Sequence, residues 1–147
     1  MVKKILEDAG KKVGLVGTVA CYIGEKKLMD SDRTTPEALE LQGMFRQMVD
    51  EGVEVVVMEV SSQSLKLHRV DGCQFDIAVF TNFSEDHISE KEHPDMQDYF
   101  NCKLKLLKMA KNGVINNDDE TVKTIKNLLP NKTIKTFGID NSSDIQA

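Results

Sequence analysis

The chain has 147 residues, a net charge of −5 at pH 7 and a hydrophobic fraction of 40%. This length predicts one domain, and the apolar content is too high for a disordered chain. The negative charge and the lack of a clustered basic face argue against nucleic acid as a partner. No apolar run reaches the roughly 18 residues of a membrane-spanning helix, and no signal-peptide pattern opens the chain, so we expect no membrane partner.

The first elements predicted are a short helix, a strand and an extended segment with a turn. Residues 2–9 have a helical pattern without an N-terminal cap, and Gly10 ends it. Residues 11–18 predict a buried strand. An extended segment with a turn at Gly24 and Glu25 is expected to follow.

The next element is an amphipathic helix. Thr35 as the cap, Pro36 at the first helical position and Glu37 near the positive end of the helix dipole predict its start. Gly52 predicts its end. We expect its apolar stripe to face the core. The stripe consists of Ala38, Leu41, Phe45, Met48 and Val49.

Two nearly continuous apolar runs, residues 54–60 and 75–82, predict strands that are buried on both faces, as in parallel sheets. Strands and helices then alternate along the rest of the chain. We expect the tail, residues 141–147, to be loosely held. The later elements expected are a helix at 94–111, a strand at 114–116, a helix at 118–129 and a strand at 133–138. This alternation predicts an α/β fold, a mostly parallel sheet with helices on both faces.

Ligands of open parallel sheets bind beyond the carboxyl ends of the strands. Glu59 follows one predicted strand, and a carboxylate there is unfavourable unless it is paired or bound to a metal. We interpret Glu59 as a functional group, with a capped structural carboxylate as the alternative. His87 follows Asp86 after the next strand and is a candidate for metal or phosphate binding. His68 and His93 lie in polar surroundings and are expected at the surface.

Lys103 lies in the middle of the apolar face of the predicted helix 94–111. One explanation is a side chain that reaches past the helix to water. The other is a functional amine in a pocket, where burial lowers its pKa. A neutral amine can react with carbon dioxide to form a carbamate, an oxygen ligand for a hard cation such as Mg²⁺.

Cys21, Cys73 and Cys102 lie far apart and form no CxxC pair, which argues against a zinc ribbon or a redox pair. Free thiols are typical of a reducing cytoplasm. We therefore expect a cytoplasmic protein, and we expect it to be a monomer.

Six segments, in this order, resemble the Mur ligase family, and within it the central domain of the UDP-N-acetylmuramoyl-tripeptide synthetases. The resemblance spans residues 5 to 140. The segments are VGLVGT, TTPEALELQ, MEVSSQSLKLHR, FTNFSEDH, YFNCKLKLL and VINNDDE.

The resemblance implies an ATPase-like central domain of an ATP-dependent ligase. Such ligases make an acyl phosphate and add an amino acid, here diaminopimelate or lysine, to UDP-N-acetylmuramoyl-L-alanyl-D-glutamate in peptidoglycan biosynthesis. It also implies that Glu59, His87 and a carbamylated Lys103 are catalytic and bind Mg²⁺ beside ATP. The same resemblance assigns substrate binding to Thr34, Thr35, Ser61 and Arg69, and cofactor binding to Asn82.

Some departures from the family pattern accompany the resemblance. The phosphate-binding loop GxxxxGK[ST] belongs just before the first helix and is not in the sequence, and neither is the C-terminal domain. Gln63 stands where many relatives have His, and the loop after His87 is longer. We therefore interpret residues 1–147 as a partial central domain, inactive alone. Two alternatives are a non-catalytic sugar-nucleotide-binding remnant and a ligase similar to folylpolyglutamate synthetase.

Overall fold

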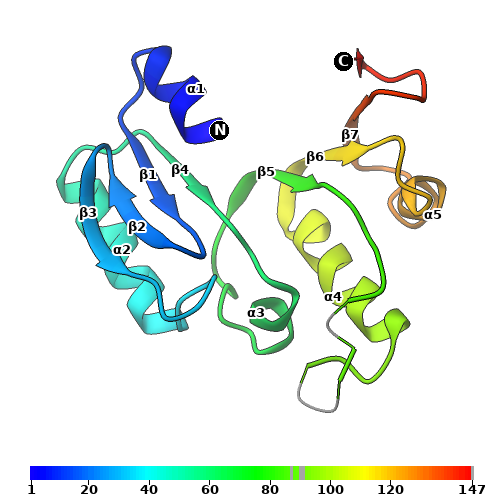
Figure 1. Ribbon diagram of the computed structural model, residues 1–147, viewed down its shortest axis with the longest axis horizontal. Coiled ribbons are helices and arrows are strands. Elements are labelled where there is room, and N and C mark those ends of the chain that lie inside the picture. The colour runs from blue at the N-terminus through cyan, green and yellow to red at the C-terminus, as the bar shows by residue number, and fades with distance from the viewer. Residues whose placement is uncertain (87, 90–91, 147) are drawn as a thin grey trace. The chain divides into compact units, whose positions relative to one another are not determined.

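The computed structural model describes residues 1–86, 88–89 and 92–146 (Figure 1). The chain forms two compact units, Met1–Asp71 and Gly72–Ala147. Each unit contains one four-stranded sheet. Among the described residues, no helix has the length and apolar character needed to cross a membrane.

The first unit is built around a mixed sheet with the strand order β3-β2-β1-β4. The predicted turn at Gly24 and Glu25 is confirmed, and it joins β2 and β3 as an antiparallel hairpin, whereas β1 and β4 run parallel. Gly24 has a φ of 54°, which favours glycine. The elements are α1 (Val2–Asp8), β1 (Val13–Val16), β2 (Ala20–Ile23), β3 (Lys26–Asp30), α2 (Ala38–Asp50), β4 (Val55–Met58) and α3 (Ser62–Lys66).

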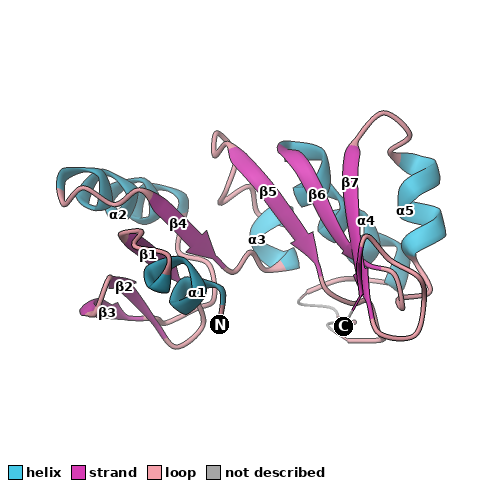
Figure 2. Cartoon of the chain, turned by 90° about the horizontal axis from the view of Figure 1, so that it is seen from above, coloured by secondary structure: helices cyan, strands magenta, loops and turns pink. Residues whose placement is uncertain are grey.

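Helix α2 lies along one side of this sheet (Figure 2). A Cβ atom at Gly14 of β1 would lie 2.6 Å from the sulfur of Met48, so this close approach of strand and helix requires glycine. Val49, which was predicted in the apolar stripe, is 61% exposed, and Met44 is buried instead. The buried residues of α2 are Leu41, Met44 and Met48.

The predicted cap of α2 is wrong. The helix begins at Ala38 with Glu37 as its N-cap residue, and no side chain caps it. Thr35 is fully buried, and its hydroxyl donates instead to the backbone carbonyl of Glu59, 3.0 Å away. A tertiary hydrogen bond therefore replaces the local one that the Thr-Pro-Glu pattern predicts.

The second unit contains an entirely parallel sheet with the order β5-β6-β7-β8. The predicted α/β class is confirmed in it. Strand β6 is longer than the predicted three residues. The elements are β5 (Phe75–Phe80), α4 (Met96–Met109), β6 (Ala110–Asn116), α5 (Val122–Leu128), β7 (Thr133–Gly138) and β8 (Ile145–Gln146).

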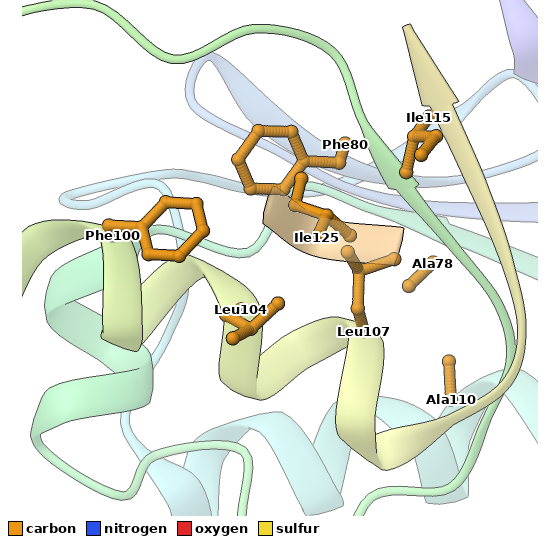
Figure 3. Packing of buried hydrophobic residues seen from close by; sticks show 8 residues of the cluster. All are labelled: Ala78, Phe80, Phe100, Leu104, Leu107, Ala110, Ile115 and Ile125. Atoms are coloured by element: carbon orange, nitrogen blue, oxygen red, sulfur yellow. The ribbon is translucent and has the colours of Figure 1, made fainter. Parts of the chain in front are cut away.

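The core of the second unit lies between its sheet and the helices α4 and α5 (Figure 3). Alternate residues of β5 face this core, whereas Ile77 and Val79 between them are 60% and 51% exposed. The expectation that residues 54–60 and 75–82 are buried on both faces is therefore wrong. Val56 of β4 is likewise 38% exposed, and β4 and β5 each lie at an edge of their sheet. The core side chains are Ala78, Phe80, Phe100, Leu104, Leu107, Ala110, Ile115 and Ile125.

The end of the chain is held in place, contrary to the expected loose tail. The carboxylate of Asp144 accepts hydrogen bonds from the backbone N–H and the hydroxyl of Thr136, at 2.8 and 2.9 Å. Asp118 accepts from the backbone N–H groups of Ile139 and Asn141, and these bonds lower the pKa of its carboxyl. Two carboxylates thus fix residues 139–144.

Candidate functional site

Glu59 lies at the carboxyl ends of the parallel strands β1 and β4. Its Oε2 accepts hydrogen bonds from the backbone N–H of Thr18 at 2.8 Å and from the Thr18 hydroxyl at 2.6 Å. A side chain at Gly17 would approach Oε2 to 3.3 Å, so glycine leaves room for the carboxylate. Glu59 is exposed, and among the described residues Oε1 accepts no hydrogen bond. The carboxylate is both capped and able to bind a ligand through Oε1.

Thr35 connects this strand end to the helix α3 that follows it. Its hydroxyl donates to the carbonyl of Glu59 and accepts from the backbone N–H of Ser61, 3.1 Å away. Ser61 itself is the N-cap of α3, because its Oγ accepts from the backbone N–H of Ser64. Thr34 joins the same network through the hydroxyl of Thr18, at 3.2 Å.

Arg69 closes the network from the other end of α3. Its guanidinium contacts the carbonyl of Thr35 at 3.4 Å and the carboxylate of Glu37 at 3.1 Å. The side chain is only 10% exposed, and its buried Nε has no hydrogen-bond partner among the described residues. The first unit thus brings together the predicted residues Thr34, Thr35, Glu59, Ser61 and Arg69.

Lys103 of α4 is half-buried in the second unit. Its Nζ lies 5.1 Å from the ring centre of Tyr99 and 5.4 Å from that of Phe80. It donates to the Tyr99 hydroxyl at 3.3 Å and to the carbonyl of Asn82 at 3.1 Å. Burial lowers the pKa of this amine, although Asp119 and Asp86 oppose the shift. The direction is the one expected for a functional amine.

Asn82 contacts Lys103 through its backbone carbonyl, and its predicted role in cofactor binding stays a prediction. The residue after it, Phe83, packs against Tyr99 with 5.1 Å between ring centres and donates its N–H to Asp119 at 2.6 Å. Sequence reasoning missed Thr18, Tyr99 and Asp119 as site residues. Tyr99 lies one helical turn before Lys103, and Asp119 follows the strand next to β5. The helical spacing and the position after a strand could therefore have identified Tyr99 and Asp119 from the sequence.

The histidines differ from expectation. His68 is exposed as expected, and its Nδ1 lies 2.7 Å from the carboxylate of Asp71. His93, expected at the surface, is fully buried, because its ring packs 5.2 Å from that of Tyr99 and its Nδ1 lies 2.7 Å from Asp98. His87 lies outside the described residues.

The whole chain, residues 1–147, matches the family model of the Mur ligase middle domain. The chain belongs to the Mur ligase family. This Mur ligase domain is 53% identical over 148 residues to a UDP-N-acetylmuramoyl-L-alanyl-D-glutamate–2,6-diaminopimelate ligase of Clostridium botulinum, and 47% identical over 147 residues to the ligase of the same name from Clostridium tetani. Both matches cover all of this chain and 30% of the relative.

A solved structure of a UDP-N-acetylmuramoyl-L-alanyl-D-glutamate–2,6-diaminopimelate ligase has the same fold. It is 26% identical and aligns with a TM-score of 0.85 over 99% of this chain and 30% of its own. This Mur ligase domain therefore spans about 30% of the length of the relatives it matches.

The described residues of the Mur ligase domain fit a hard cation in part. Glu59 offers a carboxylate oxygen, which Mg²⁺ prefers. Lys103 can offer an oxygen ligand only after its amine has reacted with carbon dioxide to form a carbamate. Glu59 belongs to the first unit and Lys103 to the second. A magnesium site that joins them with His87 therefore stays a prediction.

Proposed function

We propose that this Mur ligase domain is part of a cytoplasmic ATP-dependent ligase that joins 2,6-diaminopimelate to UDP-N-acetylmuramoyl-L-alanyl-D-glutamate in peptidoglycan biosynthesis. The names of the relatives from two Clostridium species, which are 53% and 47% identical over the whole chain, support the reaction. The names also favour diaminopimelate over lysine as the amino acid added.

The observation that carries the proposal is the hydrogen-bonded network of the first unit. Thr35, Glu59, Ser61 and Arg69, from three segments, meet there through hydrogen bonds of 3.0 to 3.4 Å. Thr34 joins them through the hydroxyl of Thr18. Arg69 presents a planar guanidinium suited to a carboxylate or a phosphate, and the substrate carries both. We assign Thr34, Thr35, Ser61 and Arg69 to binding of the sugar-peptide part.

The remaining assignments concern the transfer of the phosphoryl group of ATP. A bound Mg²⁺ would offset the charge of that group. Glu59 would hold the cation through Oε1, with His87 and the carbamate of Lys103 as further ligands. Lys103 suits this role because burial lowers its pKa and because its amine is fixed by Tyr99 and the carbonyl of Asn82. Asn82 is assigned to the nucleotide.

Calorimetric titration of the chain with UDP-N-acetylmuramoyl-L-alanyl-D-glutamate tests the proposal. We expect saturable binding at one site per chain. UDP-N-acetylglucosamine, which lacks the peptide, is expected to bind at least about tenfold more weakly, because it loses the charged contacts to Arg69. Folate serves as a control for the related ligase class, and we expect it not to bind.

A second titration, with ATP and Mg²⁺, separates the roles of the two ligands. We expect weak or no binding of nucleotide to this chain, and tighter binding to a fusion in which a GxxxxGK[ST] loop precedes the first helix. Binding of folate in place of the sugar nucleotide would contradict the proposal, as would equal affinity for the two UDP-sugars.

A further inference from the structure

Three metal-ligating side chains converge near the start of α4, on a different set of residues from the magnesium site proposed above. The nitrogen of His93, a carboxylate oxygen of Asp98 and the sulfur of Cys102 all lie within 4.8 Å of one another. We propose that His93, Asp98 and Cys102 form a binding site for a divalent transition-metal ion such as Zn²⁺.

The fold brings the three residues together before any ion binds. Asp98 and Cys102 lie one turn apart on α4, so they occupy the same face of the helix. His93 comes from the segment before the helix, and its carbonyl accepts a hydrogen bond from the N–H of Ser89 at 3.0 Å. Asp95 caps the helix by accepting from the N–H of Asp98 at 2.8 Å. The site therefore requires only small side-chain rotations.

The distances are close to those of a tetrahedral zinc site. Zinc bonds of ~2.0–2.3 Å place neighbouring ligand atoms about 3.3–3.6 Å apart. His93 Nδ1 and Asp98 Oδ2 are now 2.7 Å apart, so this pair would separate by under 1 Å. The most distant ligand atoms, at up to 4.8 Å, would approach by roughly 1 Å. Rotation about side-chain bonds achieves both changes.

The chemistry of the donor set selects the metal. A neutral imidazole, a carboxylate and a thiolate together carry two negative charges, which balance a divalent cation. Sulfur and nitrogen ligands favour zinc or cobalt over magnesium. His93 is fully buried and Asp98 is 34% exposed, so the ion would be partly shielded while a fourth position stays open to water or another ligand.

A simpler role for part of the cluster is a buried hydrogen bond between His93 and Asp98 that fixes the segment before α4. That role needs neither the sulfur of Cys102 nor an ion. A measurement that detects bonding between a metal and the thiolate therefore separates the two possibilities.

Titration of the reduced chain with Co²⁺ can detect such a bond, because cobalt binds in place of zinc and its absorption spectrum reports its ligands. We expect strong visible absorption of a tetrahedral site and sulfur-to-cobalt charge-transfer absorption in the near ultraviolet, both saturating at one ion per chain. Zn²⁺ is expected to displace the cobalt. Cys102→Ser should abolish the charge-transfer absorption, whereas Cys73→Ser, a matched change of the other half-buried thiol in this unit, should leave it intact.

A second variant keeps the test valid if Cys102→Ser disturbs folding. Asp98→Asn retains a hydrogen-bonding partner for His93 but removes the anionic ligand, and we expect at least about tenfold weaker cobalt binding. Circular dichroism of the metal-free variants checks the fold. The proposal is wrong if the wild-type chain gives no charge-transfer absorption, if that absorption survives in Cys102→Ser, or if Asp98→Asn binds cobalt with wild-type affinity.

Discussion

In the first unit, Thr18, Thr35 and Ser61 hold their neighbours through hydrogen bonds, whereas in the second unit Lys103 lies against the rings of Phe80 and Tyr99. The hydroxyl network stabilises the fold and shapes the candidate binding surface with the same bonds. The lysine is different, since burial opposes its charged form. Substitutions in the network should therefore affect stability and binding together, whereas removal of the amine should affect chemistry with little change of stability at pH 7.

The largest expected effect on stability is that of Thr35→Val, which removes a buried hydroxyl with little change of shape. The carbonyl of Glu59 and the N–H of Ser61 lose their partner, so we expect a loss of about 1–3 kcal/mol in unfolding free energy, measured by urea denaturation. Thr34→Val is the control, because Thr34 is only half-buried and makes one bond of 3.2 Å to Thr18. Equal destabilisation by the two variants would contradict the central place of Thr35.

Arg69→Lys tests the binding side of the same network. Lysine keeps the charge but not the planar fork, so we expect about a 10- to 100-fold higher dissociation constant for UDP-N-acetylmuramoyl-L-alanyl-D-glutamate by calorimetry. Arg33→Lys is the matched control, because Arg33 also contacts Glu37 but is exposed. Its effect should stay within about threefold. Unchanged affinity in Arg69→Lys would contradict the assignment of Arg69 to substrate binding.

Lys103→Met should change the unfolding free energy by less than about 1 kcal/mol at pH 7, because loss of two hydrogen bonds is offset by removal of a buried charge. The folded pKa of Lys103 lies below its unfolded value of 10.5, so the unfolded chain binds more protons between the two values. Stability of the wild type relative to Lys103→Met should therefore rise as pH increases through that interval. A fall over the same interval would mean that the amine is charged and well paired in the fold.

Asp118→Asn should give the smallest change in unfolding free energy. Its pH dependence arises from stabilisation of the charged form, whereas that of Lys103 arises from destabilisation of the charged form. Backbone N–H groups, that of Ile139 above all, lower the pKa of Asp118 in the folded chain. Its contribution is present above the ordinary pKa near 4 and is lost as pH falls through the lowered value. The difference in urea midpoint between the wild type and Asp118→Asn should shrink on acidification.

The sequence predicted elements better than it predicted their surroundings. The hairpin turn at Gly24 and the position of Lys103 on the apolar face of α4 follow from local patterns, and both are present in the structure. The apolar runs predicted that β4 and β5 are buried on both faces, but Val56, Ile77 and Val79 are exposed, because an apolar run cannot show which face of its strand another element covers.

The candidate site shows the same division between local and long-range information. The resemblance to the family selected Thr35 and Arg69, but the local pattern wrongly predicted that Thr35 caps a helix. The hydroxyl of Thr35 bonds instead to Glu59, 24 positions away, and a local pattern cannot predict a bond over that separation. His93 was expected at the surface because its sequence neighbours are polar. It is buried by Tyr99, which lies on the next helix.

The amine of Lys103 is the group on which the proposed chemistry depends, and its reaction with carbon dioxide can be observed directly. Carbon-13 NMR of the chain in ¹³C-labelled bicarbonate should show one carbamate signal. The signal should vanish in Lys103→Arg and persist in Lys105→Arg, a matched change on the same helix. A carbamate signal that survives in Lys103→Arg, or none in the wild type, would contradict the account.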